Sequence, residues 1–341
     1  MKSDTGIRQT NIELLRIISM LMVLCVHFTG ATFGLPSKVA LEDLKDLNIM
    51  SKTLMECFSI IGVNCFVLIS GYFGIRPTVK GIVNFIICCV FYSLAIYSLF
   101  VFIEPKNYDY NDLLESVLIF SNTDLWFIPA YFSLYIISPL INRGIQKLDS
   151  RSYIWLLVSL SFINIYLGWF WHGKVNPNGY TVMQMIYVYL IGAFLRRKNS
   201  IIFGKTNKLI VCYILSFSLL FISTFICPSS MAYAYNSPFV LLSSICFFCI
   251  FSSFRYTNRQ VNYISASAFS VYLIHKMPPV WLNLKEFMIT NTKNLDDSLF
   301  VLFWISFVLM IFATCISIDK IRIALLMPIS KWIIARISRF V

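Results

Sequence analysis

The stretch RQTNIELLRIISMLMVLCVHFTG, residues 8–30, decides the fold class because it reads as one helix that enters a membrane. Thr10 and Glu13 have the spacing of a capping box, whose side chains satisfy the free amides at a helix start. Arg16 follows one turn later, and ten residues without a charge separate it from His27. Eleven positions are about three helical turns, so Arg16 and His27 are predicted to share one face, about 16 Å apart along the axis.

The depth of His27 in the membrane follows from the place of Arg16. If Arg16 marks the cytoplasmic boundary, His27 lies near the middle of a hydrocarbon core about 30 Å thick. An ionisable side chain there is expensive and indicates a functional site. A structural explanation covers the same residues, with Arg16 as an anchor that reaches the headgroups and His27 as a hydrogen-bond partner of a neighbouring helix. Spacing alone leaves both interpretations open.

The composition of the chain excludes a soluble protein. Of the 341 residues, 58% are hydrophobic and 13% are charged, with a mean hydropathy of +0.75, which leaves too little polar surface to face water. Uninterrupted apolar runs exclude a β-barrel, whose strands alternate in polarity. Most of the ten cysteines lie inside these runs and are interpreted as small packing residues. The predicted class is an all-α, polytopic integral membrane protein.

About ten apolar segments are predicted to be transmembrane helices. They cover approximately residues 12–32, 54–74, 81–103, 124–142, 152–171, 180–195, 209–227, 237–254, 263–282 and 298–318. A shorter segment, 113–120, is too short to span and is placed at the membrane interface.

The net charge of +12 is distributed as membrane topology requires, and no nucleic-acid partner is expected. With the N-terminus inside, most of the 28 Lys and Arg residues fall on the inner side, which the positive-inside rule assigns to the cytoplasm. Both termini are therefore predicted to be cytoplasmic. The basic loop 196–208 is interpreted as topogenic, with a second role in holding an anionic cofactor left open. Residues 1–320 are predicted to form the transmembrane domain, and 321–341 a basic amphipathic helix on the inner leaflet.

The two other histidines have different settings. His275 ends the run SAFSVYLIH, about 20 Å into the ninth segment by helical rise. It either shares a cavity with His27 or is a satisfied interface histidine beside Lys276. His172 lies in an aromatic outer loop and is interpreted as an interfacial residue.

The second segment carries polar and small residues in the run GVNCFVLISGYFGIR, residues 62–76. An interhelical hydrogen bond explains Asn64, and close helix packing explains the pair Ser70 and Gly71. Arg76, at the inner boundary, is either a topology anchor or a contact for a phosphate group.

The fourth segment carries Trp126, Tyr131 and Tyr135 in the run LWFIPAYFSLYIISPLIN. The two tyrosines are four residues apart and lie on one helix face. They line a polar cavity in one interpretation and pack against other aromatic rings in the other.

These runs together resemble the integral membrane acyltransferases of acyltransferase family 3, which include bacterial polysaccharide O-acetyltransferases. The run RQTNIELLRIISMLMVLCVHF resembles the opening motif of that family, with Arg16 and His27 at its arginine and histidine positions. The resemblance extends over nearly the whole chain, because later motifs of the family are similar to the runs GVNCFVLISGYF, LWFIPAYFSLYIISPLI, YLIGAFLRR and SAFSVYLIH. Many relatives carry a paired-arginine motif where this chain has GIRPTVKGI, with only Arg76 and Lys80, which leaves the contacts to the donor phosphates open.

The resemblance implies an enzyme that takes an acyl group from acyl-CoA, usually acetyl-CoA, and transfers it to a hydroxyl of a lipid-linked or surface glycan. It implies a place in the bacterial cytoplasmic membrane, with lipid as a further partner and no metal, and it implies that His27 is catalytic. Arg16 and Arg76 are then expected to bind the donor at the basic inner rim. His27 is expected to take the proton of a sugar hydroxyl, or to carry the acyl group itself. The cavity and acceptor side are assigned to His275, Asn64, Ser70, Trp126, Tyr131 and Tyr135.

A flippase for lipid-linked glycans, or a small-molecule transporter, is the alternative that the same residues leave open. About ten spans, basic inner loops and a polar residue in the first span suit that class too. Dependence on acyl-CoA would distinguish the enzyme from a transporter.

Overall fold

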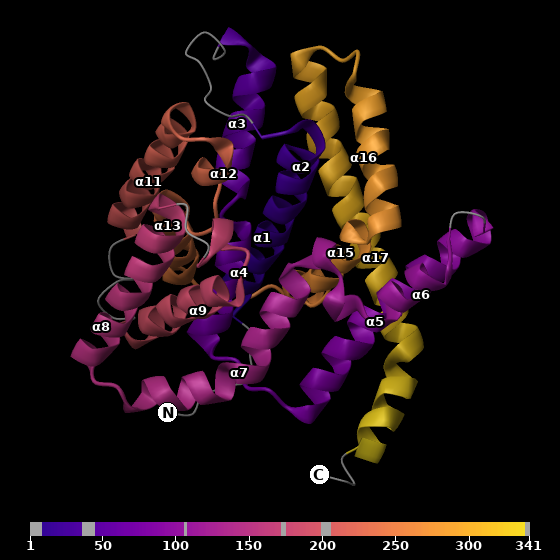
Figure 1. Cartoon of the computed structure of the whole chain (residues 1–341), viewed down its shortest axis with the longest axis horizontal. Helices are drawn as coiled ribbons and strands as arrows, with labels where there is room; N and C mark the ends of the chain where they lie inside the picture. The colour runs from indigo at the N-terminus through magenta and orange to yellow at the C-terminus, as the bar shows by residue number, and fades with distance from the viewer. Residues whose placement is uncertain (1–8, 36–44, 106–107, 172–174, 199–205, 338–341) are drawn as a thin grey trace. The chain divides into compact units, whose positions relative to one another are not determined.

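The computed structural model of the chain describes residues 9–35, 45–105, 108–171, 175–198 and 206–337, and its regular elements there are helices (Figure 1). The predicted all-α class is confirmed. The chain forms two compact units, each from two separate parts of the sequence. Unit 1 comprises Met1–Gly74 and Leu148–Ala268, and unit 2 comprises Ile75–Lys147 and Phe269–Val341. His172 lies outside the described residues.

Unit 1 contains the helix that carries Arg16 and His27. Its elements are α1 (Thr10–Phe28), α2 (Gly30–Phe33), α3 (Leu47–Ser59), α4 (Gly62–Phe73), α8 (Ser150–Ser161), the π-helix η5 (Phe162–Phe170), the 3₁₀ turn η6 (Pro177–Gly179), α9 (Val182–Arg197), α11 (Thr206–Ile226), α12 (Ser229–Ala232), α13 (Pro238–Ser253) and α14 (Arg259–Ser265).

Helices α4 and α9 of unit 1 cross at close range, and a glycine on each helix makes this approach possible (Figure 1). A Cβ atom on Gly71 would collide with the backbone of Tyr189, and one on Gly192 would collide with the backbone of Leu68. Small residues let membrane helices approach each other closely, which strengthens dispersion contacts where water is absent. The prediction that Gly71 serves close helix packing agrees with this geometry.

The start of α1 differs from the predicted capping box. Gln9 is the N-cap residue and makes no side-chain cap hydrogen bond. The Thr10 hydroxyl instead accepts a hydrogen bond from the backbone amide of Asn258, at 3.2 Å, and Glu13 pairs with other side chains. The predicted capping box is wrong, because the Thr10 oxygen that would have capped the helix accepts its hydrogen bond from Asn258, which is distant in sequence.

Unit 2 contains two long helices and several shorter ones. Its elements are α5 (Val79–Ile103), α6 (Tyr110–Val117), η3 (Ile119–Ser121), η4 (Thr123–Leu125), α7 (Phe127–Lys147), α15 (Ala268–Lys276, which begins at the last residue of unit 1), α16 (Pro278–Thr292) and α17 (Asp297–Ile337). Helices α16 and α17 lie side by side, with Phe287 stacked on Phe307 at 5.6 Å between ring centroids (Figure 1).

Helix α6 covers most of the short segment, 113–120, that is predicted to lie at the interface. Its capping box is complete, because the Asp109 carboxylate accepts from the amides of Asp112 and Asn111 and Asp112 returns the contact. The same amides lower the pKa of Asp109. The helix exposes Leu114 and Val117, as an interfacial helix would toward lipid.

Six helices of the described residues are long and apolar enough to cross a membrane, so the chain is a multi-pass membrane protein. They coincide with six of the predicted segments: Thr10–Phe33, Leu47–Phe73, Val79–Ile103, Ser150–Phe170, Thr206–Ile226 and Asp297–Leu326. The segment near 237–254 forms a shorter apolar helix, Pro238–Ser253. The number ten itself stays a prediction.

The ninth predicted segment, 263–282, is not one helix. It is divided among α14, α15 and α16, with breaks at residues 266–267 and at Met277. Pro278 and Pro279 occupy the first positions of α16, where a missing amide proton costs nothing, and they prevent α15 from continuing. The last helix, by contrast, runs through the boundary at residue 320 to Ile337. The side chains beyond residue 326 lie outside the described part, so the amphipathic tail stays a prediction.

Candidate active site

Arg16 and His27 lie on the same helix, α1, as the spacing predicts. Nη1 of Arg16 forms an ion pair with Glu13 at 3.0 Å, and 31% of the Arg16 side chain is exposed. The Glu13 carboxylate also accepts a hydrogen bond from the Ser265 hydroxyl at the end of α14. Arg16 is therefore held in the first half of α1, with part of its side chain still exposed.

His27 occupies the last turn of α1 and is half-buried. The helix ends at Phe28, and Thr29 turns both its amide and its hydroxyl back to the carbonyl of Cys25. The hydroxyl of Thr32 donates to the carbonyl of His27 at 2.9 Å. These contacts satisfy carbonyls that a helix end leaves open and so fix the backbone that carries the imidazole.

Glu56, on α3, reaches the break that follows His27. Its side chain is 1% exposed, and its Oε2 accepts a hydrogen bond from the amide of Gly30 at 3.2 Å. A Cβ atom at residue 30 would lie 3.0 Å from Oε1 of Glu56, a tight contact that glycine avoids. Sequence reasoning missed Glu56, although a charged residue at the edge of an apolar segment is the signal that could have found it.

A network of buried amides lies behind this region. Asn64 on α4 and Gln184 on α9 both donate to the carbonyl of Tyr235, at 2.9 and 2.8 Å. The amide of Gln184 also donates to the side-chain oxygen of Asn64 at 3.3 Å. The interhelical hydrogen bond predicted for Asn64 is therefore present, and it ties two helices to the buried stretch that follows α12.

The network continues into the π-helix η5. Asn176 donates to the side-chain oxygen of Asn164 at 2.6 Å, and Asn236 donates to the backbone carbonyls of both residues. Gly168 leaves room for the amide of Asn236, 3.0 Å from where a Cβ would stand. π-Helical turns often occur at functional sites because they place side chains where an α-helix could not.

Two predicted features of unit 1 have contacts that a structural role explains. The Ser70 hydroxyl donates to the carbonyl of Phe66 in its own helix, at 3.0 Å. Arg196, from the basic loop, donates to the carbonyls of Tyr72 and Phe73 at the end of α4. Cations at a helix C-terminus bind its unpaired carbonyls, so this arginine supports α4.

The remaining predicted residues belong to unit 2. Arg76 is exposed in the connection before α5. His275 is fully buried, and its Nδ1 donates to the carbonyl of Val271 one turn earlier on α15, at 2.5 Å. Its ring meets Tyr272 edge-on. A cavity shared by His275 and His27 stays a prediction.

The aromatic residues of the fourth segment pack as rings. Tyr131 and Tyr135, on α7, lie 6.4 and 6.3 Å from Phe85 on α5, measured between ring centroids. Trp126 precedes α7 and meets Phe127 edge-on. These contacts match the packing interpretation, and an acceptor role for the three residues stays a prediction.

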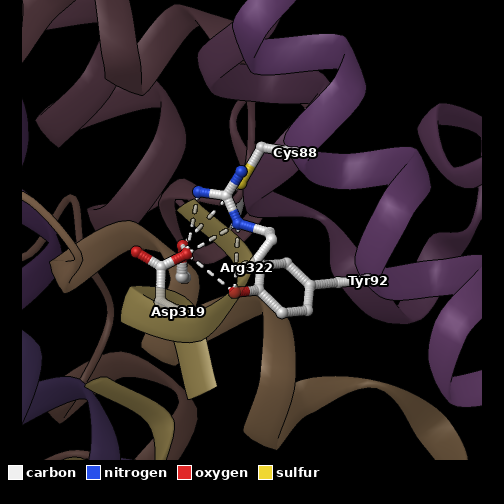
Figure 2. Close-up of polar contacts among 5 residues, drawn as sticks. Cys88, Tyr92, Asp319 and Arg322 are labelled. Carbon is white, nitrogen blue, oxygen red and sulfur yellow. Dashed lines mark hydrogen bonds and ion pairs between the residues drawn. The ribbon is translucent and has the colours of Figure 1, made fainter. Parts of the chain in front are cut away.

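Unit 2 also has a buried ionic cluster that the sequence analysis does not single out (Figure 2). Oδ1 of Asp319 accepts from the hydroxyls of Tyr92 and Ser270, each at 2.7 Å, and from Nε of Arg322 at 2.8 Å. Arg322 also makes an ion pair with Asp319 at 2.8 Å, and Asp319 is 1% exposed. In the sequence, the spacing of three residues between Asp319 and Arg322 is the signal that could have predicted this ion pair on one helix face.

A cavity of about 220 Å³ lies in unit 2, where α5, α6 and α16 meet. Its polar lining includes Tyr97, Tyr108, Asp112, Glu115 and Asn122. Together with the exposed apolar residues of α6, this lining gives the helix a polar inner face and an apolar outer face.

The fold and site define a class of protein before any comparison. The protein has several apolar helices, and the first of them carries an arginine and a histidine three turns apart. A buried carboxyl lies beside the end of that helix, so the chain is a membrane protein with polar groups among its helices. The family model described as an acyltransferase domain matches residues 9–320, and the chain belongs to the acyltransferase 3 family. It is therefore a membrane acyltransferase. No curated protein and no solved structure matches the chain.

Proposed function

We propose that this protein is an O-acetyltransferase of the bacterial cytoplasmic membrane, which moves an acetyl group from cytoplasmic acetyl-CoA to a hydroxyl of a cell-envelope or surface glycan. The observation that carries the proposal is the placement of Arg16 and His27 on α1, in a chain that belongs to an acyltransferase family. The two residues lie on one helix, Arg16 in its first half and His27 in its last turn, about 16 Å apart along its axis. An extended donor with an anionic head and a reactive thioester end suits that separation.

In the proposed reaction His27 acts as a general base. The hydroxyl oxygen of the acceptor attacks the thioester carbonyl carbon while the imidazole takes the hydroxyl proton. A carbon–oxygen bond forms, the carbon–sulfur bond breaks, and the CoA thiolate leaves with the proton returned by the imidazolium. The last turn of α1 favours the transient cation, because the C-terminal end of a helix carries the partial negative charge of the helix dipole.

Arg16 is proposed to bind the anionic part of the donor. Its ion pair with Glu13 holds the side chain in place, and the guanidinium retains donors for phosphate oxygens. Arg76 is proposed as a second contact, since it is exposed on the connection between α4 and α5.

Replacing His27 tests the chemical role directly. Base catalysis contributes about 10²- to 10⁴-fold, so His27→Ala should lower acetyl transfer by about that factor. Asparagine can keep a hydrogen bond but cannot take the proton, so His27→Asn should be almost as inactive. The measurement is transfer of labelled acetyl groups from acetyl-CoA to glycan in membranes with matched amounts of each variant. An active His27→Asn protein would return His27 to a structural role, and transfer that does not depend on acetyl-CoA would overturn the proposed function.

A further inference from the structure

The cavity between α5, α6 and α16 in unit 2 has no part in the proposed reaction step. Its volume is about 220 Å³, and its polar lining faces an apolar wall to which Met277, Pro278, Pro279 and Leu282 contribute. Pockets for drug-sized ligands have volumes of about 300–1,000 Å³, so this cavity suits a smaller group. A single sugar ring is such a group.

Contacts within unit 2 hold the polar side of the cavity in place. Tyr97 on α5 donates its hydroxyl to the carbonyl of Asp109 at 3.1 Å, and Oδ2 of Asp112 accepts from the amide of Asp109 at 2.8 Å. The rings of Tyr97 and Tyr108 meet edge-on, with 6.0 Å between their centroids. These contacts join α5 to the start of α6, so a ligand spends little binding free energy on ordering this side of the cavity.

The polar lining offers both donors and acceptors of hydrogen bonds. Oδ1 of Asn122 accepts from the amide of Asp124 at 2.9 Å, and the NH₂ group of Asn122 can only donate. The Tyr108 hydroxyl can do both, whereas the Glu115 carboxylate can only accept. A sugar matches this mixture, because each of its hydroxyls donates and accepts. An ammonium ligand, which only donates, does not match it.

The charge of the lining selects against acidic ligands. Asp112 and Glu115 are both acidic, and the lining that the structure describes includes no lysine or arginine. A phosphate or a sugar carboxylate would therefore meet like charges without a cation to offset them. The tyrosine rings and the prolines offer apolar surface to the C–H face of a sugar ring. The lining therefore favours a neutral sugar.

The cavity lies beside a helix with the character of an interfacial helix. Helix α6 exposes Leu114 and Val117, while Asp112, Glu115 and Ser116 line the cavity. Such a helix lies at the depth of the lipid headgroups, where the sugar of a lipid-linked glycan also lies. The predicted topology puts this segment on the outer side of the membrane.

We propose that this cavity binds one neutral sugar unit of a lipid-linked glycan at the outer membrane surface. The inference rests on the proposed function and deepens it, because it names the chemical class of the acceptor. Tyr108 and Glu115 hydrogen-bond the sugar hydroxyls, and the tyrosine rings pack against the ring carbons. An acceptor whose sugars are all acidic is excluded.

Direct binding tests the site without any acetyl transfer. The protein is purified into lipid nanodiscs without acetyl-CoA, and binding is measured by saturation-transfer difference NMR. The probes are the methyl glycosides of neutral hexoses, of 6-deoxyhexoses and of N-acetylhexosamines, with methyl glucuronide as the acidic probe. At least one neutral probe should bind, and the glucuronide should bind about 10-fold more weakly or worse, because of like-charge repulsion.

Two nearly isosteric substitutions locate the bound sugar. Tyr108→Phe removes one hydroxyl, and Glu115→Gln removes the charge of one acceptor and keeps its shape. Each should raise the Kd of the bound probe about 3- to 10-fold, as weakening of one hydrogen bond predicts.

Matched controls come from the same two helices. Tyr110 on α6 and Glu286 on α16 are exposed and are not among the residues that line the cavity. Tyr110→Phe and Glu286→Gln should leave the Kd unchanged. All four variants should melt at the wild-type temperature, because none of the four side chains belongs to the buried core.

The possible failures separate the sugar site from the proposed function. If no neutral probe binds, or if Tyr108→Phe and Glu115→Gln keep the wild-type Kd, the inference is overturned and the proposed function stands. Equal weakening in the control variants, or binding of the glucuronide as tight as that of the neutral probes, would also overturn it. A wild-type protein that binds the sugar but transfers no acetyl group from acetyl-CoA would remove the proposed function and leave a sugar-binding site.

Discussion

At the scale of single residues, Arg16 combines a fixed position with exposure. Nη1 is bound to Glu13, and a guanidinium has five N–H donors, so the residue can hold its place and still bind phosphate. Arg16→Ala should raise the KM for acetyl-CoA about 10-fold or more, since a hydrogen bond to a charged group is stronger than a neutral one. Arg16→Lys should recover part of the loss. Steady-state kinetics at fixed acceptor measure both.

The control for Arg16 is Arg259→Ala, which removes an exposed arginine of α14 in the same unit. It removes the same charge, so a general effect of membrane or surface electrostatics would appear in both variants. Equal kinetics for Arg16→Ala and the wild type would reduce Arg16 to a headgroup anchor.

The residues of the candidate site differ in how far the sequence predicts them. Arg16 and His27 are predictable because both lie on one helix, whose periodicity fixes their relative position. The position of Glu56 depends on the amide of Gly30, which lies 26 residues away in another helix. No local pattern specifies such contacts between distant segments. The sequence shows that polar side chains lie within apolar segments, but only the folded structure shows which groups they contact.

At the scale of elements, hydrogen bonds between side-chain amides and a carbonyl join α4 and α9 to the stretch after α12. Leucine at Gln184 would leave Asn64 without its amide donor and remove one of two bonds to the carbonyl of Tyr235. Gln184→Leu should therefore destabilise the protein by about 1–3 kcal/mol, the cost of leaving buried polar groups unpaired. Thermal unfolding in detergent measures the loss.

A double substitution separates the network from general damage to the core. Asn64→Leu together with Gln184→Leu removes both amides, so the combined loss should be smaller than the two single losses added. Asn291→Leu is a control, since that exposed amide also donates to a carbonyl, that of Phe287. Strict additivity of the two core substitutions would contradict a coupled network.

The pairing of Asp319 with Arg322 stabilises the contact of α17 with α5 and α15 (Figure 2). Arg322→Met should cost about 3–5 kcal/mol, because it leaves a buried carboxylate without its cation. The double variant Asp319→Leu with Arg322→Met should be more stable than Arg322→Met alone, since no uncompensated charge remains. Melting temperatures of the three proteins decide this. A double variant less stable than the single one would show that the hydroxyls of Tyr92 and Ser270 dominate the cluster.

At the scale of the whole molecule, hydropathy predicts the all-α class and most long helices, because lipid requires every backbone polar group to be paired within a helix. It fails where the chain breaks inside an apolar stretch. Met277 and the two prolines after it divide the ninth segment, and α9 reaches only 16 residues. A window of average hydropathy cannot see such breaks, because apolar residues continue across them.

The topology remains a prediction that charge distribution supports. Reporter fusions after residues 45, 110, 200 and 341 should report outside, outside, inside and inside. The physical reason is the excess of Lys and Arg in the loops assigned to the cytoplasm. Fusion after residue 341 is the most informative, since an external C-terminus would require an odd number of spans.

The hydrogen bond from Asn64 to the carbonyl of Tyr235 has a consequence for biosynthesis. The two residues are 171 positions apart, so the first helices of unit 1 are made long before their partner exists. At about 5–20 residues per second, the ribosome needs roughly 10–30 s to reach it. During that time the Asn64 amide must lie at the insertion machinery, in the interface, or against a temporary partner. Assembly of this unit therefore cannot be completed before the second half of the chain has been translated as far as Tyr235.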